Sequence, residues 1–309
     1  MTPVAPAPIS LVTNAKINLF LALRGRREDG YHEIATVLHS VSLADDLVVA
    51  EGAAPRDHIE LEFEPWLGPV TIPEEQNLVA RAALLMRERL GQDGALEVTL
   101  RKRIPLGAGL GGGSANAAGA LIALNRLWAA RLDAAELGRL GAELGSDVPY
   151  CLVGGTAMAT GRGEVVRRME VPQSLWFLLG MSSQPLPTAD VYRAWSPGAA
   201  PREPQALVAA LAAGDPASLA GLLHNDLETV AFELRPWLRR AKAALLDAGA
   251  LGACLSGSGP TLFALTDGEA HARAVAAAVK GVFDRVVVVS SRPACIEPAG
   301  QQATGAVVG

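Results

Sequence analysis

The stretch "RIPLGAGLGGGSANAAGAL", residues 103–121, has glycine at five of the seven positions from 107 to 113. It follows the alternating segment "ALEVTL" (95–100), which is typical of a strand, and leads into alanine-rich sequence that predicts a helix from about Ser114. Successive glycines let backbone N–H groups converge without a Cβ in the way, and the start of a helix adds partial positive charge. The stretch therefore predicts a loop between a strand and a helix that holds phosphate oxygens.

The same glycines also satisfy G-x-G-x-x-G at 107–112, the pattern of a dinucleotide-binding turn. Against that interpretation, Pro105 lies two residues before the motif, and no strand ending in a ribose-binding acid follows about 20 residues later. Asp133 is the nearest acid, and together with Glu136 it resembles a capping box at the start of a helix. A Walker A loop is excluded because the Gly-Lys-Ser/Thr ending is missing. A flexible glycine-rich connector is the remaining alternative, and the strong helix start disfavours it.

The overall composition restricts the partners of such a loop. The chain has 309 residues, enough for two domains, and its formal net charge of −5 argues against a nucleic-acid-binding protein. The three cysteines form no CxxC pair, so neither a zinc site nor a disulfide framework is indicated. No apolar run approaches the roughly 20 residues that cross a bilayer. We expect a cytoplasmic protein with no membrane and no nucleic-acid partner.

The segment "LVTNAKINLFLAL" (11–23) predicts a strand with one apolar face and one face that carries polar and charged side chains. Its odd positions are mostly apolar, whereas Asn14, Lys16 and Asn18 share the other face. A lone ammonium group beside apolar neighbours is expected to meet an anion, although a surface lysine is the plainer alternative. Farther along, "NLVARAALLMRERL" (77–90) predicts a helix that its first residue, an asparagine, can cap.

From about residue 165 the pattern changes to a second set of elements. "SLWFLLG" (174–180) and "RVVVVS" (285–290) predict strands, and more strands are expected around "GACLSGSGPTLFAL". A mixed sheet with helices on one face accommodates these elements as an independent α+β unit. We therefore predict two domains, at 9–165 and 166–296. The helices predicted in the second domain span 204–213, 216–232, 236–248 and 269–280.

The glycine-rich segment "PLGAGLGGGSANAA" (105–118) resembles the phosphate loop of the GHMP kinase superfamily. Further motifs occur in the order found in the branch of that superfamily that acts on 4-diphosphocytidyl-2-C-methyl-D-erythritol, and the similarity spans about residues 11–266. "AKINLFL" together with "DGYH" is the specific part, since the glycine loop alone indicates only the superfamily. The motifs are "AKINLFL" (15–21), "DGYHEI" (29–34), "QNLVARAA" (76–83), "GSDVPY" (145–150) and "SGSGPT" (256–261).

This resemblance implies an α/β, two-domain GHMP kinase fold, with a ribosomal-protein-S5-like N-terminal domain and a ferredoxin-like C-terminal domain. It implies transfer of the γ-phosphate of ATP, with Mg²⁺, to the 2-hydroxyl of 4-diphosphocytidyl-2-C-methyl-D-erythritol in non-mevalonate isoprenoid precursor synthesis. The small-molecule substrate and ATP are the expected partners of a monomer or homodimer. A homoserine kinase-like enzyme and a non-catalytic nucleotide-binding member are the alternatives.

By resemblance, Lys16 and Asp147 are the catalytic residues. Asp147 lies in the "SDVP" turn, where the superfamily has the acid that receives the proton of the acceptor hydroxyl, and Lys16 pairs with it. Phosphoryl transfer needs such positioning and charge stabilisation more than covalent chemistry. Taken alone, an Asp before Val148 and Pro149 equally indicates a helix N-cap.

The resemblance places the cytidine of the substrate at Tyr31 and His32, with Tyr192 as the opposing stacking face and Thr188 as a polar contact. A cytosine ring needs a flat partner to stack on and directional hydrogen bonds to its edge, which Tyr and His supply. Asn18 would help to hold the acceptor. The alternatives are an exposed loop aromatic and a solvated histidine.

The resemblance also assigns an ATP site. Asn77, Leu78 and Lys102 match positions around the adenine pocket, although Leu78 also fits a core position and Lys102 an exposed charge at a strand end. Ser114 would meet the metal only through Mg-ATP. The phosphate loop itself comprises Pro105, Leu106, Gly107, Ala108, Gly109, Leu110, Gly111, Gly112, Gly113, Ser114, Ala115 and Asn116, and the third superfamily motif comprises Gly257, Ser258 and Gly259.

Overall fold

The first two strands are unusually long and form the centre of the larger of two β-sheets. The computed structural model describes residues 6–54, 56–68, 70–197 and 202–300. Strands β1 (Ile9–Arg26) and β2 (His32–Glu51) pair antiparallel over nearly their whole length, with irregularities that include one between Asn14 and Ala15. The turn at "REDGY" joins them, as the Asp-Gly pair predicts.

The larger sheet has the strand order β12-β1-β2-β4-β3, and β5 and β6 extend it from β2. The predicted strand at 95–100 is confirmed as β4, which ends immediately before the glycine-rich segment. A two-residue strand, β8, adds to β1 in parallel. The bounds are β3 (His58–Phe63), β4 (Leu96–Lys102), β5 (Thr156–Gly161), β6 (Val165–Met169), β8 (His224–Asn225) and β12 (Ile296–Pro298).

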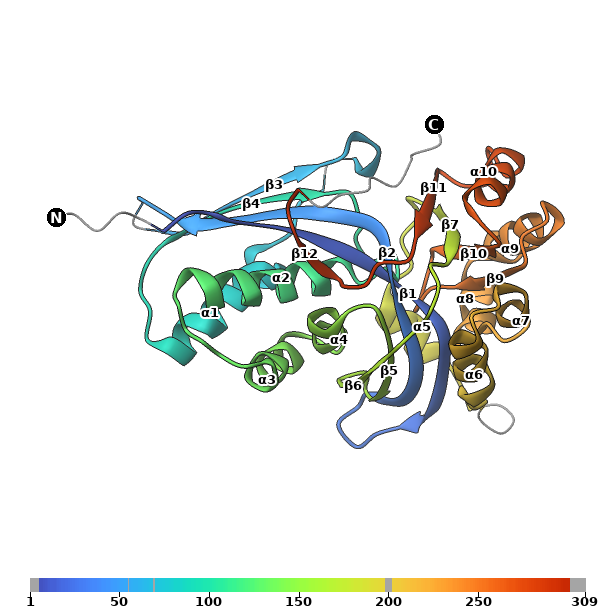
Figure 1. Ribbon diagram of the computed structural model, residues 1–309, viewed down its shortest axis with the longest axis horizontal. Coiled ribbons are helices and arrows are strands. Elements are labelled where there is room, and N and C mark those ends of the chain that lie inside the picture. Colours follow the sequence, from blue (N-terminus) through green and yellow to red (C-terminus); the bar gives the residue numbers. More distant parts are fainter. Residues whose placement is uncertain (1–5, 55, 69, 198–201, 301–309) are drawn as a thin grey trace.

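Four helices cover one face of the larger sheet, below β1 to β4 in Figure 1. The predicted capping by Asn77 is confirmed, because its side chain accepts the Val79 N–H. The capping box of Asp133 and Glu136 is also present. Hydrogen bonds between residues close in the sequence set the starts of these two helices, so the starts could be predicted from the sequence. The helices are α1 (Leu78–Leu90), α2 (Gly112–Leu127), α3 (Ala134–Leu144) and α4 (Val148–Val153), with 3₁₀ turns at Pro65–Leu67 and Glu74–Gln76.

The second sheet has four strands in the order β11-β7-β10-β9, and every pair is antiparallel rather than mixed as expected. Along β7, Phe177 and Leu179 pack toward β1 and β2, whereas Leu178 packs toward helices on the other face. This period of two buries both faces of the sheet. The strands are β7 (Trp176–Met181), β9 (Gly252–Leu255), β10 (Leu262–Thr266) and β11 (Arg285–Ser290).

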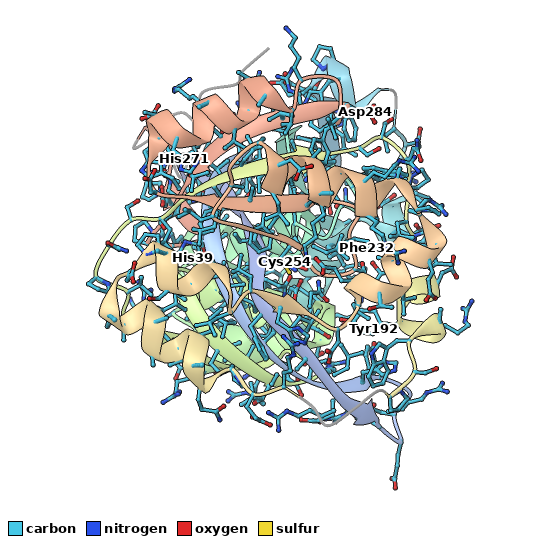
Figure 2. The ribbon with its side chains drawn as sticks, turned by 90° about the vertical axis from the view of Figure 1, so that its right-hand side faces the viewer. His39, Tyr192, Phe232, Cys254, His271 and Asp284 are labelled. Carbon is cyan, nitrogen blue, oxygen red and sulfur yellow. The ribbon has the colours of Figure 1, made fainter. Side chains whose placement is uncertain are left out.

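The predicted helix at 216–232 is wrong. The helix starting at Pro216 ends at Ala220, and His224 and Asn225 instead form β8 against Phe20 and Leu21. A pairing with a distant strand thus replaces the local helical preference. Figure 2 shows the helices of the second half facing the viewer. They are α5 (Thr188–Ala194), α6 (Gln205–Ala213), α7 (Pro216–Ala220), α8 (Glu228–Leu234), α9 (Trp237–Asp247) and α10 (Glu269–Ala278).

Two short segments of the second half, β8 and β12, belong to the larger sheet, so the chain returns twice to β1 after residue 166. The division into domains at 9–165 and 166–296 remains a prediction. The three cysteines are buried and free. In the described ranges, no helix is both long and apolar enough to span a bilayer.

Candidate active site

A cavity of about 1050 Å³ lies between the larger sheet and the second half of the chain. Its lining comes from β1, the β1–β2 turn and β2, the start of α1, the glycine-rich segment, the turn before α4, the β5–β6 turn, α5 and the residues after it, and the turn between β9 and β10. The residues therefore come from distant parts of the sequence. Such a concave site with convergent polar groups is the usual form of a small-molecule pocket.

The glycine loop approaches two other parts of the site so closely that a side chain would collide with them. Gly109 and Gly111 have φ of +76° and +68°, respectively. A Cβ on Gly109 would lie 2.0 Å from the carbonyl oxygen of Ser256, and one on Gly111 would lie 2.8 Å from Cγ of Lys16. No backbone N–H from residues 107 to 111 donates to another described residue. These amides are free to receive an anion.

A network of buried polar side chains holds the residues that directly precede the glycine loop. Asp45, fully buried, accepts hydrogen bonds from the backbone N–H groups of Arg103 (2.7 Å) and Ile104 (2.9 Å). Its other oxygen accepts from Asn116 (3.0 Å) and pairs with Lys102. Lys102 is 1% exposed and does not line the cavity, so the alternative of an exposed charge at a strand end is wrong. Its assignment to the adenine pocket stays a prediction.

Hydrogen bonds on both sides hold the turn of the third motif (residues 256–261). The Ser256 hydroxyl donates to the Gly109 carbonyl at 2.8 Å, which joins this turn to the glycine loop. On its other side, the buried Asn225 amide donates to the carbonyls of Leu255 (2.8 Å) and Gly257 (2.7 Å). Asn225 was missed in the sequence because it fell inside the wrongly predicted helix. By accepting from Asn225, the Gly257 carbonyl is satisfied by protein rather than left for the cavity.

Lys16 and Asp147 meet in the cavity. Lys16 Nζ lies 3.3 Å from Asp147 Oδ2 and donates to Asn18 Oδ1 at 2.8 Å. The Asn18 amide in turn donates to the Thr36 hydroxyl at 2.9 Å, which holds the side chain in place. Asp147 occupies the N-cap position of α4, yet its side chain makes no capping hydrogen bond. Its carboxylate therefore remains available on the side away from Lys16.

Aromatic side chains gather at the other end of the cavity. The rings of His32 and Tyr192 lie 5.4 Å apart between centroids, and Trp195 meets His32 edge-on at 5.5 Å. Tyr31 is 50% exposed, and the guanidinium of Arg162 lies 5.0 Å from its ring centroid. Arg162 and Trp195 were not identified from the sequence, since neither lies in a motif and only the fold brings them here.

The polar groups at this end favour neutral forms. Burial, together with the charge of Arg26, lowers the pKa of His32, so its imidazole is neutral at pH 7 and offers one donor and one acceptor. Burial raises the pKa of Tyr192, which keeps its phenol protonated. The hydroxyl of Thr188 shares a hydrogen bond of 2.9 Å with that of Ser258, which links α5 to the third motif.

The structure brings most of the predicted site residues to this one cavity. Those that do not line it lie just behind it, in helix caps, loop anchors or the core. Asn77 caps α1, and Leu78 beside it reaches the cavity. The predicted residues outside the lining are Asn77, Lys102, Leu110, Ala115, Asn116 and Gly259; those inside it are Lys16, Asn18, Tyr31, His32, Leu78, Pro105, Leu106, Gly107, Ala108, Gly109, Gly111, Gly112, Gly113, Ser114, Asp147, Thr188, Tyr192, Gly257 and Ser258.

The oxygen atoms that the cavity offers suit a metal ion bound mainly by substrate phosphates rather than one bound by protein side chains alone. Among the residues that the structure describes, no group of three or more His, Cys, Asp or Glu side chains converges on a metal site. Asp147 and Ser114 nevertheless supply one carboxylate and one hydroxyl to the same cavity. Mg²⁺ is commonly bound in this way, by one or two protein oxygens together with substrate phosphates and water.

Comparison with known proteins agrees with this arrangement. Residues 77–155 match the model of the GHMP kinases N terminal domain, and residues 207–285 match that of the GHMP kinases C terminal. A crystal structure of homoserine kinase from Cytophaga hutchinsonii superposes with a TM-score of 0.74 at 23% identity, covering 96% of this chain and 99% of that one. Fold and phosphate loop thus define the class as GHMP kinases.

The more similar relatives narrow this class. The chain is 43% identical over 282 residues to the 4-diphosphocytidyl-2-C-methyl-D-erythritol kinase of Pelotomaculum thermopropionicum, covering 91% of this chain and 96% of the relative. The corresponding kinase of Nocardia farcinica is 43% identical, with coverages of 91% and 92%. A crystal structure of 4-(cytidine 5'-diphospho)-2C-methyl-D-erythritol kinase has a TM-score of 0.76 at 38% identity, with coverages of 92% and 99%. The chain belongs to the 4-diphosphocytidyl-2-C-methyl-D-erythritol kinase family.

Proposed function

We propose that this protein transfers the γ-phosphate of ATP to the 2-hydroxyl of 4-diphosphocytidyl-2-C-methyl-D-erythritol, in the methylerythritol phosphate route to isoprenoid precursors. The observation that carries the proposal is one cavity with three regions. A glycine loop with free amides and an aromatic group of Tyr31, His32 and Tyr192 line it, and the Lys16–Asp147 pair lies in the same cavity. Such a cavity can hold a nucleotide phosphate and a base-bearing acceptor together.

We assign the acceptor hydroxyl to Asp147. Its carboxylate accepts the hydroxyl's hydrogen bond and takes the proton as the new P–O bond forms, while the β–γ bond of ATP breaks. Lys16 supplies positive charge where the transferred phosphoryl oxygens are most negative. Because Asn18 accepts from Lys16 and donates to Thr36, the ammonium group is held in one position before any substrate arrives.

The phosphates of ATP belong at the glycine loop, where the amides of residues 107 to 111 and the start of α2 provide hydrogen-bond donors and positive potential. Mg²⁺ would be held by these phosphates with help from Ser114. When bound, the ion offsets charge on the phosphate oxygens. The adenine is assigned to the region of Asn77, Leu78 and Lys102; of these three, Leu78 lines the cavity.

The cytidine belongs at the aromatic end. Tyr31 and Tyr192 offer flat faces for stacking, and the neutral imidazole of His32 offers a donor and an acceptor to the base edge. Thr188 adds a polar contact beside the third motif. The cytoplasmic location and the oligomeric state, monomer or homodimer, remain predictions.

The test is ADP release by the purified protein with ATP and Mg²⁺, in separate reactions with 4-diphosphocytidyl-2-C-methyl-D-erythritol, homoserine and mevalonate. Turnover confined to the cytidylyl substrate supports the proposal. Turnover with homoserine favours the homoserine kinase-like alternative, for which the aromatic end of the cavity has no purpose. ATP binding without turnover of any acceptor favours a non-catalytic member.

A further inference from the structure

We propose that Arg162 is a positioning residue for the base pocket: its guanidinium covers one face of the Tyr31 ring and holds that ring ready to stack on the cytosine with the other. This inference rests on the proposed function, since it concerns how the same pocket recognises the base.

The turn that carries Arg162 has a tightly defined backbone. Arg162 lies between β5 and β6, flanked by Gly161 at φ +73° and Gly163 at φ +117°. Its N–H donates to the Glu164 carboxylate at 2.7 Å, which closes the turn. Two consecutive β-strands therefore deliver this side chain to the cavity from a rigid hairpin.

The guanidinium itself makes two different contacts. Its Nη2 donates to the Ala142 carbonyl in α3 at 2.5 Å, and its carbon lies 5.0 Å from the Tyr31 ring centroid. A planar cation that is fixed by a hydrogen bond and also lies over an aromatic ring loses little freedom when it acts as a support. Arg162 thereby connects the β5–β6 turn, the end of α3 and the loop after β1.

Tyr31 needs such a support. Its ring is 50% exposed, whereas the hydrogen bonds of Tyr31 to its own loop involve the backbone: its N–H donates to the Asp29 carboxylate at 3.1 Å, and its carbonyl accepts from the Arg27 N–H at 2.7 Å. An exposed aromatic ring that must stack on a ligand loses rotamer freedom on binding, and that loss weakens affinity. A guanidinium on one face restricts the ring in advance and leaves the opposite face for the base.

The chain offers a matched control. Arg168, in the next strand of the same hairpin, likewise donates to backbone carbonyls, in its case two, those of Val153 at 3.0 Å and Pro293 at 2.9 Å. It does not line the cavity. Replacing either arginine by alanine removes a cation and its carbonyl contacts, but only the Arg162 change removes the support of Tyr31.

The experiment measures binding of cytidine 5'-diphosphate by calorimetry, together with KM for each substrate, and uses melting temperature to confirm folding. We expect Arg162→Ala to weaken binding and raise KM for the cytidylyl substrate by about five- to tenfold, with KM for ATP and kcat within about twofold of the original protein. Arg162→Lys should recover part of the loss, and Arg168→Ala should leave binding unchanged.

A double-mutant cycle shows whether Arg162 affects binding through Tyr31 or by contacting the ligand itself. If Arg162 acts through Tyr31, adding Arg162→Ala to Tyr31→Ala weakens binding no further. Additive losses would mean that Arg162 contacts the ligand itself, and unchanged binding in Arg162→Ala would mean that it does nothing for the pocket; both overturn the inference. If the unaltered protein binds cytidine 5'-diphosphate but never converts the cytidylyl substrate, the proposed function is wrong. The binding measurements alone then decide whether Arg162 supports Tyr31. Absence of binding overturns both.

Discussion

Lys16 Nζ lies 3.3 Å from Asp147 Oδ2, and this pair joins the first strand of the chain to the start of α4. The two side chains differ in exposure: that of Lys16 is 5% exposed and that of Asp147 is 33%. The buried ammonium is therefore a fixed part of the site, whereas the carboxylate still has a side open to a substrate. The assignment of Asp147 to the acceptor hydroxyl depends on this difference.

Asp147→Asn should lower kcat by about 10²- to 10⁴-fold, because the amide cannot take the proton of the acceptor hydroxyl. ATP affinity should change little, since the glycine loop keeps its own amides. Steady-state ADP release and calorimetric titration with ATP measure the two quantities. Asp267→Asn, which alters a carboxylate with a 71% exposed side chain, serves as the control. Equal losses of turnover and ATP affinity would make Asp147 a structural residue instead.

Gly109→Ala should destabilise the protein much more than Gly107→Ala. Both glycines have positive φ, so each alanine incurs roughly 1–2 kcal/mol for the left-handed conformation. A Cβ on Gly109 would also lie 2.0 Å from the Ser256 carbonyl oxygen, whereas one on Gly107 meets nothing within 4 Å. We expect the collision to add about 2 kcal/mol or more. Urea denaturation measures both variants, and similar losses would show that the two loops can separate freely.

Asp45→Asn should cost about 3–5 kcal/mol of unfolding free energy, because it leaves the buried ammonium of Lys102 without its counter-charge. Its sequence neighbour provides the comparison. Asp46 pairs with Arg103 at 2.6 Å, but both side chains are about a third exposed, so Asp46→Asn should cost at most about 1 kcal/mol. Chemical denaturation of both variants tests this. A loss from Asp45→Asn as small as that from Asp46→Asn would contradict the role of Asp45 as the anchor of the loop.

His39 should make folding stability depend on pH. Burial lowers its pKa from 6.5 to about 4, and both ring nitrogens hydrogen-bond to hydroxyls, those of Thr156 and Ser291. The unfolded chain binds the proton first as the pH falls, so the stability from the neutral ring is complete above pH 6.5 and is lost toward pH 4, by about 3 kcal/mol.

Melting temperatures between pH 7 and pH 4 should thus fall more steeply for the unaltered protein than for His39→Asn. His58→Asn, which changes an exposed histidine, should follow the unaltered protein. A slope that His39→Asn leaves unchanged would assign the pH dependence to carboxylates alone.

Features set by neighbouring residues were predictable from the sequence. The cap at Asn77, the capping box of Asp133 and Glu136 and the shared face of Lys16 and Asn18 all depend on contacts within a few positions, and the structure has each of them. The glycine loop was likewise predictable, because the glycines that its backbone conformation requires lie close together in the sequence.

Features set by distant pairing were not predictable in this way. His224 and Asn225 leave the helical pattern because β1 provides strand partners for them. Arg162 reaches Tyr31 only after the β5–β6 hairpin has folded beside the loop after β1. Lys102 ends an alternating strand as an exposed charge would, and only the fold places Asp45 next to it. Each of these depends on a contact for which a single sequence carries no local signal.

The most direct test of the central claim is the position of the new phosphate in the reaction product. The purified protein is incubated with ATP, Mg²⁺ and 4-diphosphocytidyl-2-C-methyl-D-erythritol, and the product is examined by ³¹P and ¹³C NMR, with Asp147→Asn in parallel. We expect one phosphomonoester, coupled to C2 of the methylerythritol, beside an intact diphosphate, and far less of it with the variant over the same incubation time. A phosphate on another hydroxyl, or ADP formed with inorganic phosphate alone, would contradict the proposed activity.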